Sequence, residues 1–217
     1  MNEGRNDRKS RLIDPKSGTW ASSSQDFVRL ANLLYEQSIN YAKQTDGNCS
    51  IYTLAGIPVL FSALRCVLIE MNTPLLPSAK NAGGPEKMKK LAESANDIRF
   101  LLDQYQDRIS DGLKKKLELL VEVRNEIIHP AHLPSGAKHN TPTYLGPLRH
   151  EGILQSTGKE SDYVFIAQLQ SHRLFRWAFE IAGEVVEIVI TSHYGNNSIF
   201  QPMVESYSRY KELDRNL

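Results

Sequence analysis

A periodic apolar pattern that runs into a proline places the strongest constraint on the fold, and it lies at residues 109–130. Apolar residues recur there at steps of three and four, which is the spacing of one helix face: Leu113, Leu117, Leu120 and Ile128. Pro130 disfavours helical backbone at the residue before it, so the helix is predicted to end near Ile128. Arg124 falls on the same stripe, where an arginine needs a charged partner, a cleft or an interface.

Other segments also favour helices. They are residues 22–43, which follow serines able to cap a helix, residues 51–71, residues 85–102 and residues 172–193, with a short helix expected after them. Short connections between long amphipathic helices favour antiparallel neighbours. The sequence therefore predicts an all-α protein, an up-and-down helical bundle with an inserted loop or small β-hairpin before the last long helix.

The segment from Ile51 to Met71 is the most apolar in the chain. Pro58, Arg65 and Glu70 interrupt it, and the uninterrupted part is shorter than the roughly 20 residues that a bilayer needs. Pro58 is expected to kink the helix or to mark its true start. We therefore predict a central helix of a soluble bundle and no membrane contact.

Charge and cysteine content indicate an ordinary soluble protein. The net charge of +1 argues against broad non-specific binding to nucleic acid but permits a local basic cleft. The lysines at 87, 89, 90 and 114–116 are more simply solvated helix faces than phosphate contacts. Cys49 and Cys66 lack metal-type spacing, which favours reduced core thiols in a cytoplasmic protein.

The domain organisation is predicted to be simple. Residues 1–19 are polar and lack the apolar core of a signal peptide, so we expect a mobile tail before one domain at 20–217. Within that domain, residues 130–170 form an insertion in which helical periodicity is lost. Ile153–Gln155 and Tyr163–Leu169 could pair as a short hairpin. A lid or RNA-facing rim and a surface excursion without a role fit this insertion equally well.

The helix end at Pro130 also carries chemically useful groups. Arg124 can bind a phosphate through two N–H groups, and a histidine such as His129 exchanges protons near neutral pH. Asn125 is four residues before His129 and therefore on the same helix face. A metal held by His129 and His132 is disfavoured because Pro130 disrupts their spacing and no further ligands complete a site. The sequence contains no phosphate-binding glycine loop and no nucleophile elbow, and we predict no cofactor.

Arg124-Asn125-x-x-x-His129, followed by Pro130, resembles the R-polar-x-x-x-H signature of the HEPN superfamily. These are small α-helical domains, and many are metal-independent RNases of toxin–antitoxin and antiviral systems. The resemblance implies that Arg124 and His129 are catalytic, with Asn125 as the polar residue beside the arginine. It also implies a homodimer whose two motifs share one cleft, RNA as substrate, and an antitoxin or other partner protein.

Two other interpretations stay open at the level of sequence. In the first, the chain is a HEPN module that does not cleave RNA and instead binds a nucleotide, RNA or a protein. In the second, Arg124 pairs with Glu70, Glu122 or another carboxylate inside the bundle, and His129 only caps the helix.

Overall fold

The computed structural model describes residues 23–45, 48–72, 98, 102–129, 144–154, 165–195 and 201–215. These residues are mainly helical and contain no strand beyond one isolated antiparallel bridge, Cys49 to Ser171. The elements are α1 (Ser23–Gln44), α2 (Tyr52–Asn72), the 3₁₀ turn η2 (Asp103–Tyr105), α5 (Asp111–Ile128), α6 (Leu145–His150), α7 (Phe165–Gln168), α8 (His172–Tyr194), α9 (Gln201–Ser208) and α10 (Tyr210–Arg215). The all-α prediction is confirmed.

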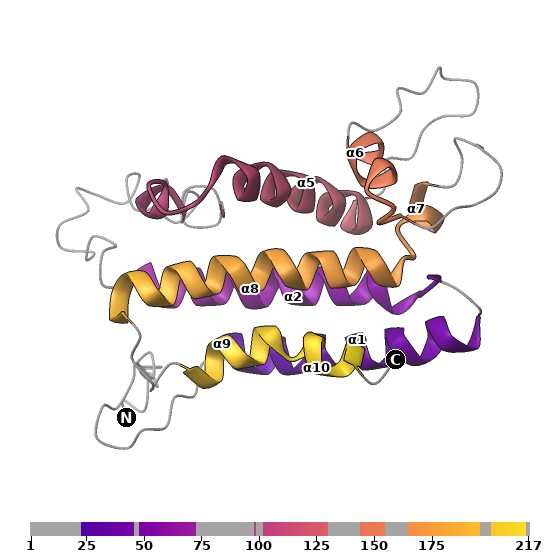
Figure 1. Ribbon diagram of the computed structural model, residues 1–217, viewed down its shortest axis with the longest axis horizontal. Helices are drawn as coiled ribbons and strands as arrows, with labels where there is room; N and C mark the ends of the chain where they lie inside the picture. Colours follow the sequence, from indigo (N-terminus) through magenta and orange to yellow (C-terminus); the bar gives the residue numbers. More distant parts are fainter. Residues whose placement is uncertain are drawn as a thin grey trace, which may run out of the picture.

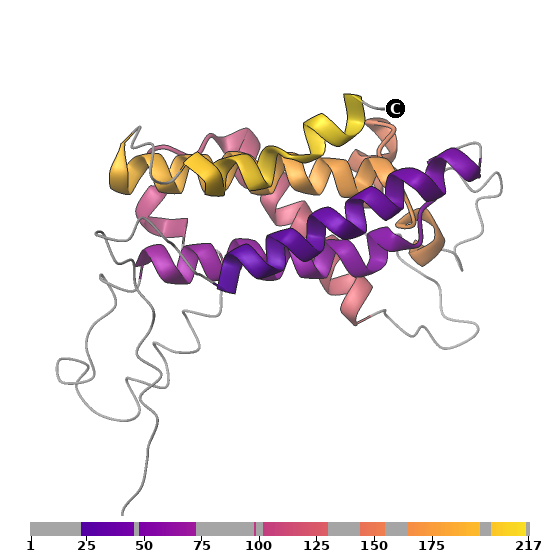
Figure 2. The ribbon, with the colours of Figure 1, turned by 90° about the horizontal axis from the view of Figure 1, so that it is seen from below.

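The long helices run in alternate directions and form three layers (Figure 1). Helices α2 and α8 make the middle layer, with α5 on one side of it and α1, α9 and α10 on the other. Seen from below, α1 lies beside α2 and α9 lies against α8 (Figure 2). This order is the up-and-down arrangement expected from the alternating apolar segments.

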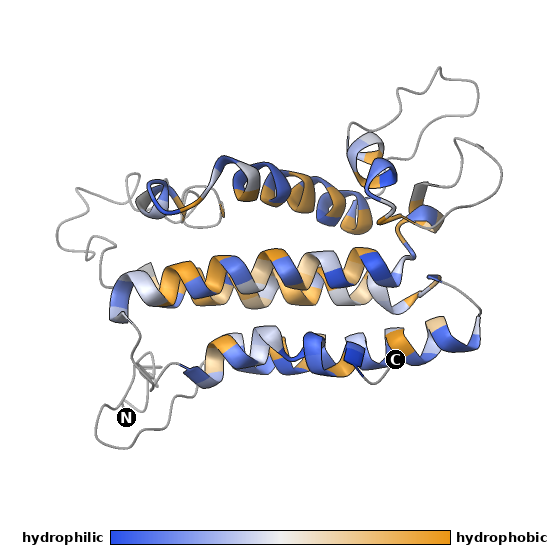
Figure 3. Ribbon diagram, in the orientation of Figure 1, coloured by the Kyte–Doolittle hydropathy of each residue, from blue (hydrophilic) through white to orange (hydrophobic). Residues whose placement is uncertain are grey.

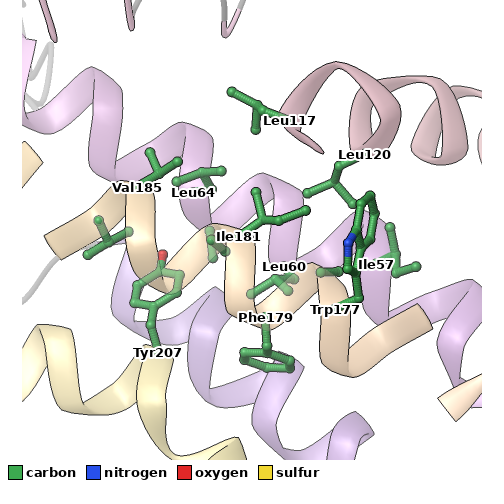
Figure 4. Packing of buried hydrophobic residues seen from close by; sticks show 14 of the residues in the cluster. Ile57, Leu60, Leu64, Leu117, Leu120, Trp177, Phe179, Ile181, Val185 and Tyr207 are labelled. Atoms are coloured by element: carbon green, nitrogen blue, oxygen red, sulfur yellow. The ribbon is translucent and has the colours of Figure 1, made fainter. Parts of the chain in front are cut away.

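The core lies where the middle layer meets its two neighbours. Most of the strongly apolar colour falls on α2 and α8, which contact helices on both sides (Figure 3). The close view shows buried side chains from α2, α5, α8 and α9 meeting there (Figure 4): Leu60, Leu64, Leu117, Leu120, Trp177, Ile181 and Tyr207. Burial of these apolar surfaces is the main force that holds α5 against the middle layer.

The predicted helix bounds agree with the structure to within one or two residues for four helices. Helix α1 covers 23–44 where 22–43 was predicted, and α8 covers 172–194 where 172–193 was predicted. Helix α5 begins at Asp111, two residues after the predicted start, because Ser110 caps it by accepting a hydrogen bond from the Leu113 N–H. Pro58 lies inside α2 and does not start it, since the helix begins at Tyr52. The predicted helix at 85–102 lies almost wholly outside the described residues.

Within the predicted insertion at 130–170, the described residues 144–154 and 165–170 contain helices that the composition did not suggest. Residues 145–150 form helix α6, and Tyr144, Leu145 and Leu148 are buried against the core. Residues 165–168 form the helical turn α7, so the second strand of the predicted hairpin is wrong at these positions. Ile153 and Leu154 are buried but form no strand, and the rest of the predicted hairpin lies outside the described residues. The predicted tail at 1–19 also lies outside them.

Helix α2 is long and apolar enough to cross a membrane by length and composition alone, a test that core helices of soluble proteins also pass. Only 44% of its most apolar window is buried within the described structure. Ile51, just before the helix, is 49% exposed, and Pro58 and Phe61 are half-buried. The most apolar helix of the chain therefore keeps part of its surface outside the core.

Candidate functional site

The C-terminal half of α5 positions the predicted site, and its buried face departs from the predicted stripe after Leu120. Leu113, Leu117, Leu120 and Val123 are the buried residues of this helix. Arg124 is only half-buried, and Ile128 is 38% exposed. The placement of Arg124 on the buried stripe was therefore wrong. Its side chain lies at the edge of the packed face and is half-exposed.

Two neighbours fix the Arg124 guanidinium. Its Nη1 donates a hydrogen bond of 2.9 Å to Asn125 Oδ1, and its central carbon lies 5.5 Å from the centre of the Phe61 ring on α2. The Nε atom of Arg124 is buried and has no hydrogen-bond partner among the described residues. The Asn125 side chain thus accepts its hydrogen bond from the arginine, although Asn125 and His129 share a helix face.

His129 is the C-cap residue of α5, and its backbone has left the helix with φ −129° and ψ 66°. Its backbone N–H donates to the Asn125 carbonyl oxygen at 2.8 Å, which closes the last turn. The imidazole is exposed. At about 1.5 Å of rise per residue, the backbones of Arg124 and His129 are separated by about 7.5 Å along the helix axis. Within the described part of the chain their side chains form no hydrogen bond with each other, so one protomer places them at the same helix end without joining them.

Acidic and aromatic groups lie beside this helix end. Glu122 and Glu126 on α5 are half-buried, and Tyr144, just before α6, is buried near them. The pKa of the Tyr144 hydroxyl is raised, first by burial and then by the negative charges of Glu126 and Glu122. Lys114, Lys115 and Lys116 are exposed, as expected of a solvated face, but they occupy the first half of the helix. The immediate surroundings of Arg124 and His129 therefore have mixed charge.

The described residues contain no candidate metal site, because no three or more histidine, cysteine, aspartate or glutamate side chains lie together among them. His132, the other member of the weak candidate pair, lies outside the described residues. Both cysteines are free and half-buried, so they are less deeply placed than the predicted core thiols. Burial still raises the pKa of the Cys66 thiol, with a further contribution from Glu70.

The sequence reasoning missed Phe61 and a buried polar cluster at the other side of the bundle. The sequence around Phe61 does not indicate its contact with Arg124, because that contact joins two different helices.

In the buried polar cluster, His172 Nδ1 lies 2.9 Å from Ser38 Oγ, and His172 Nε2 lies 3.7 Å from Asp214 Oδ1. Ser38 is fully buried, so the three residues cannot serve as a hydrolytic triad towards a substrate in solvent. They tie α10 to α1 and α8.

Comparison with known proteins adds no relative. No family model matches the chain, no curated protein is significantly similar to it, and no solved structure matches the fold described above.

Proposed function

We propose that this chain is a metal-independent endoribonuclease of the HEPN type, in which Arg124 and His129 act on the RNA phosphodiester. The observation that carries the proposal is their placement at the end of α5, with an exposed imidazole and a half-buried guanidinium held by Asn125 and Phe61. A role in toxin or defence systems rests on the motif resemblance alone.

The proposed reaction needs a base, an acid and a cation. An imidazole takes the proton from the ribose 2′-hydroxyl, whose oxygen attacks the adjacent phosphorus. The bond from phosphorus to the 5′-oxygen breaks, and an imidazolium donates a proton to that leaving oxygen. The Arg124 guanidinium stabilises the charge that develops on the phosphoryl oxygens. The products are a 2′,3′-cyclic phosphate and a 5′-hydroxyl end.

One chain supplies only one motif histidine, so the proposed site is completed by a second copy. The half-exposed apolar surface on α2 and at the end of α5, formed by Ile51, Pro58, Phe61 and Ile128, supports this arrangement. Phe61 lies beside Arg124, and Ile128 directly precedes His129 in the chain. Pairing of two copies through this surface would remove apolar side chains from water and bring two motifs together. A second copy is therefore the occupant that we propose for this surface.

The dimer is tested by sedimentation of the full chain. Ile51→Glu is expected to convert a dimer into a monomer, because it places a charge in the proposed apolar interface. The matched control is Leu33→Glu, which changes an equally apolar residue of α1 that is 59% exposed in the opposite layer, and it should leave the dimer intact. A monomeric wild-type protein, or a dimer broken only by Leu33→Glu, contradicts the proposed interface. Binding of the wild-type monomer to lipid vesicles would assign the surface to a membrane instead.

Cleavage is tested with labelled RNA in the presence of EDTA, with detection of the 2′,3′-cyclic phosphate. His129→Ala is expected to lower the rate by about 10²–10⁴-fold, which is the usual contribution of a positioned acid or base. Arg124→Ala is expected to lower it by about 10²–10³-fold, which is the usual cost of removing one group that stabilises transition-state charge. His193→Ala is the matched control, because His193 is an exposed histidine in the last turn of α8, which lies at the other end of the bundle from the motif (Figure 1). Cleavage that survives His129→Ala unchanged refutes the proposed chemistry.

A non-catalytic HEPN module is the second candidate. The observation in its favour is that Arg124 Nη1 donates a hydrogen bond to Asn125 Oδ1, while no hydrogen bond joins Arg124 to the His129 imidazole within the described part of the chain. Such a module is expected to bind RNA or nucleotide without cleaving it, and to lose that binding on Arg124→Ala but not on His129→Ala. Binding isotherms for these two variants therefore separate the two functions.

A further inference from the structure

The Phe61 ring lies against Arg124 although the two residues belong to different helices. The guanidinium carbon is 5.5 Å from the ring centre, within the range at which a cation is attracted to an aromatic face. Phe61 is half-buried and packs against the hydrophobic core. The position of the ring is therefore set by the packing of α2 against the core, independently of Arg124.

The two contacts of Arg124 are complementary. The guanidinium carbon lies over the Phe61 ring, and Asn125 Oδ1 accepts a hydrogen bond from Nη1. An arginine side chain loses considerable rotamer freedom when it binds a ligand, and prior restriction reduces that cost. The Arg124 Nε is buried without a hydrogen-bond partner among the described residues, so its N–H is not held by a polar group there. The orientation of the guanidinium plane accordingly depends on the ring and on Asn125.

We infer that Phe61 is a positioning residue, which holds the Arg124 guanidinium in the plane needed to receive an RNA phosphate. This inference rests on the proposed function for its consequence in catalysis, but the contact itself can be measured without any activity. Phe61 does not touch the reacting atoms and acts on the reaction through Arg124. Because Arg124 is proposed to stabilise charge that develops in the transition state, the loss of Phe61 should lower the rate of the chemical step more than it weakens substrate binding. Because Phe61 also belongs to the proposed dimer surface, sedimentation of each Phe61 variant shows whether the dimer is retained.

The first test measures kcat and KM for RNA cleavage by the full-length chain. Phe61→Leu keeps an apolar side chain and removes the aromatic face, and it is expected to lower kcat by about ten- to a hundredfold while KM changes little. Phe61→Tyr keeps the face and should retain cleavage. Val59→Ala is the control, because Val59 lies on the other side of the same helix, some 200° from Phe61 at 3.6 residues per turn. Thermal unfolding of each variant shows whether it is folded.

The second test is the Nε–H resonance of Arg124 in ¹⁵N-labelled protein, identified by its loss in Arg124→Lys. A ring below the guanidinium shifts this proton upfield, and burial of Nε slows its exchange with water. Phe61→Leu should move the resonance downfield, whereas Phe61→Tyr and Val59→Ala should leave it in place. An unmoved resonance in Phe61→Leu overturns the inference.

The outcomes separate the inference from the function on which it rests. If the wild type cleaves RNA and Phe61→Leu cleaves equally fast, the positioning role is refuted and the nuclease stands. If the wild type cleaves no RNA, the nuclease is refuted, and the Arg124 resonance alone decides whether Phe61 holds the guanidinium.

Discussion

Gly56 is a single residue on which the contact between α2 and α8 depends. A Cβ atom built at this position would lie 2.0 Å from Cζ and 2.2 Å from Cε1 of Phe175. Phe175 is fully buried, and its ring makes an edge contact with Tyr35, with 5.3 Å between ring centres. The ring cannot retreat without disturbing the aromatic cluster around it, so only glycine allows α2 and α8 to approach as closely as they do.

We predict that Gly56→Ala destabilises the protein by about 1–3 kcal/mol, the usual cost of overpacking a core. Gly183→Ala is the matched control in α8, where the added Cβ would meet the Tyr207 carbonyl oxygen at an ordinary 3.6 Å. Because alanine is the better helix former, that change should be neutral or stabilising by up to about 1 kcal/mol. Urea unfolding of both variants checks the prediction, and equal stability of the two would contradict it.

Arg124 shows what a sequence can and cannot reveal about one side chain. From Leu120, both a three-residue and a four-residue step continue a helical stripe, and these steps lead to Val123 and Arg124 respectively. Periodicity alone does not choose between them; the direction in which α2 and α8 approach α5 does. The structure buries Val123 and leaves Arg124 at the edge. The motif was therefore located correctly on the helix, while its contact with Phe61 could not be predicted.

At the scale of elements, the helix ends were predictable where local chemistry marks them. Serines begin α5 and α8, and the proline at 130 follows the end of α5. Helix α6 was missed because its sequence, Leu-Gly-Pro-Leu-Arg-His, contains two residues that disfavour helices. Burial of Leu145 and Leu148 stabilises it nonetheless. Tertiary packing thus stabilises helix α6, although the helix propensities of its glycine and proline disfavour it.

Ser171 links the start of α8 to two other segments. Its side chain accepts a hydrogen bond from the Leu174 N–H at 3.2 Å and another from Asn48 Nδ2 at 2.8 Å, and it donates to the Ile153 carbonyl oxygen. Ser110 performs only the first of these roles for α5, with the Leu113 N–H, and is exposed. The two serines form a natural pair for comparing a simple cap with a cap that also joins segments.

We predict that Ser171→Ala costs about 2–3 kcal/mol, because it removes a helix cap and leaves buried polar groups without partners. Ser110→Ala should cost only about 1 kcal/mol, the value of a cap alone. Denaturant unfolding of each variant gives the two free energies. Equal losses would show that the bonds to Asn48 and Ile153 contribute nothing.

At the scale of the whole molecule, the C-terminal helix α10 is held to the bundle by a buried polar cluster. Asp214 accepts a hydrogen bond from the Tyr35 hydroxyl at 2.8 Å, and its other oxygen lies 3.3 Å from Arg176 Nε. His172 lies between this carboxylate and Ser38. The order of the helices was predictable from the sequence, but this cluster was not, since its members come from α1, α8 and α10.

The titration of His172 links this cluster to pH. Burial lowers the pKa of His172 most, and Arg176 lowers it further, while Asp214 opposes them without reversing the shift. Glu180 and Tyr210 are the other ionisable groups of α8 and α10 in this cluster. A histidine whose pKa is lower in the folded state than in the unfolded chain binds protons more readily after unfolding. Its contribution to stability is therefore complete above the unfolded pKa of about 6.5 and is lost as the pH falls through the lower folded value.

We predict that the free energy of unfolding decreases on acidification from pH 7.5 to 5, and that His172→Gln makes this decrease shallower. His150→Ala removes an exposed histidine and should leave the slope unchanged. Urea unfolding at several pH values measures the slope. An identical slope in His172→Gln and the wild type would show that burial of an uncharged His172 does not account for the loss of stability in acid, because a histidine with a lowered folded pKa must contribute to that slope.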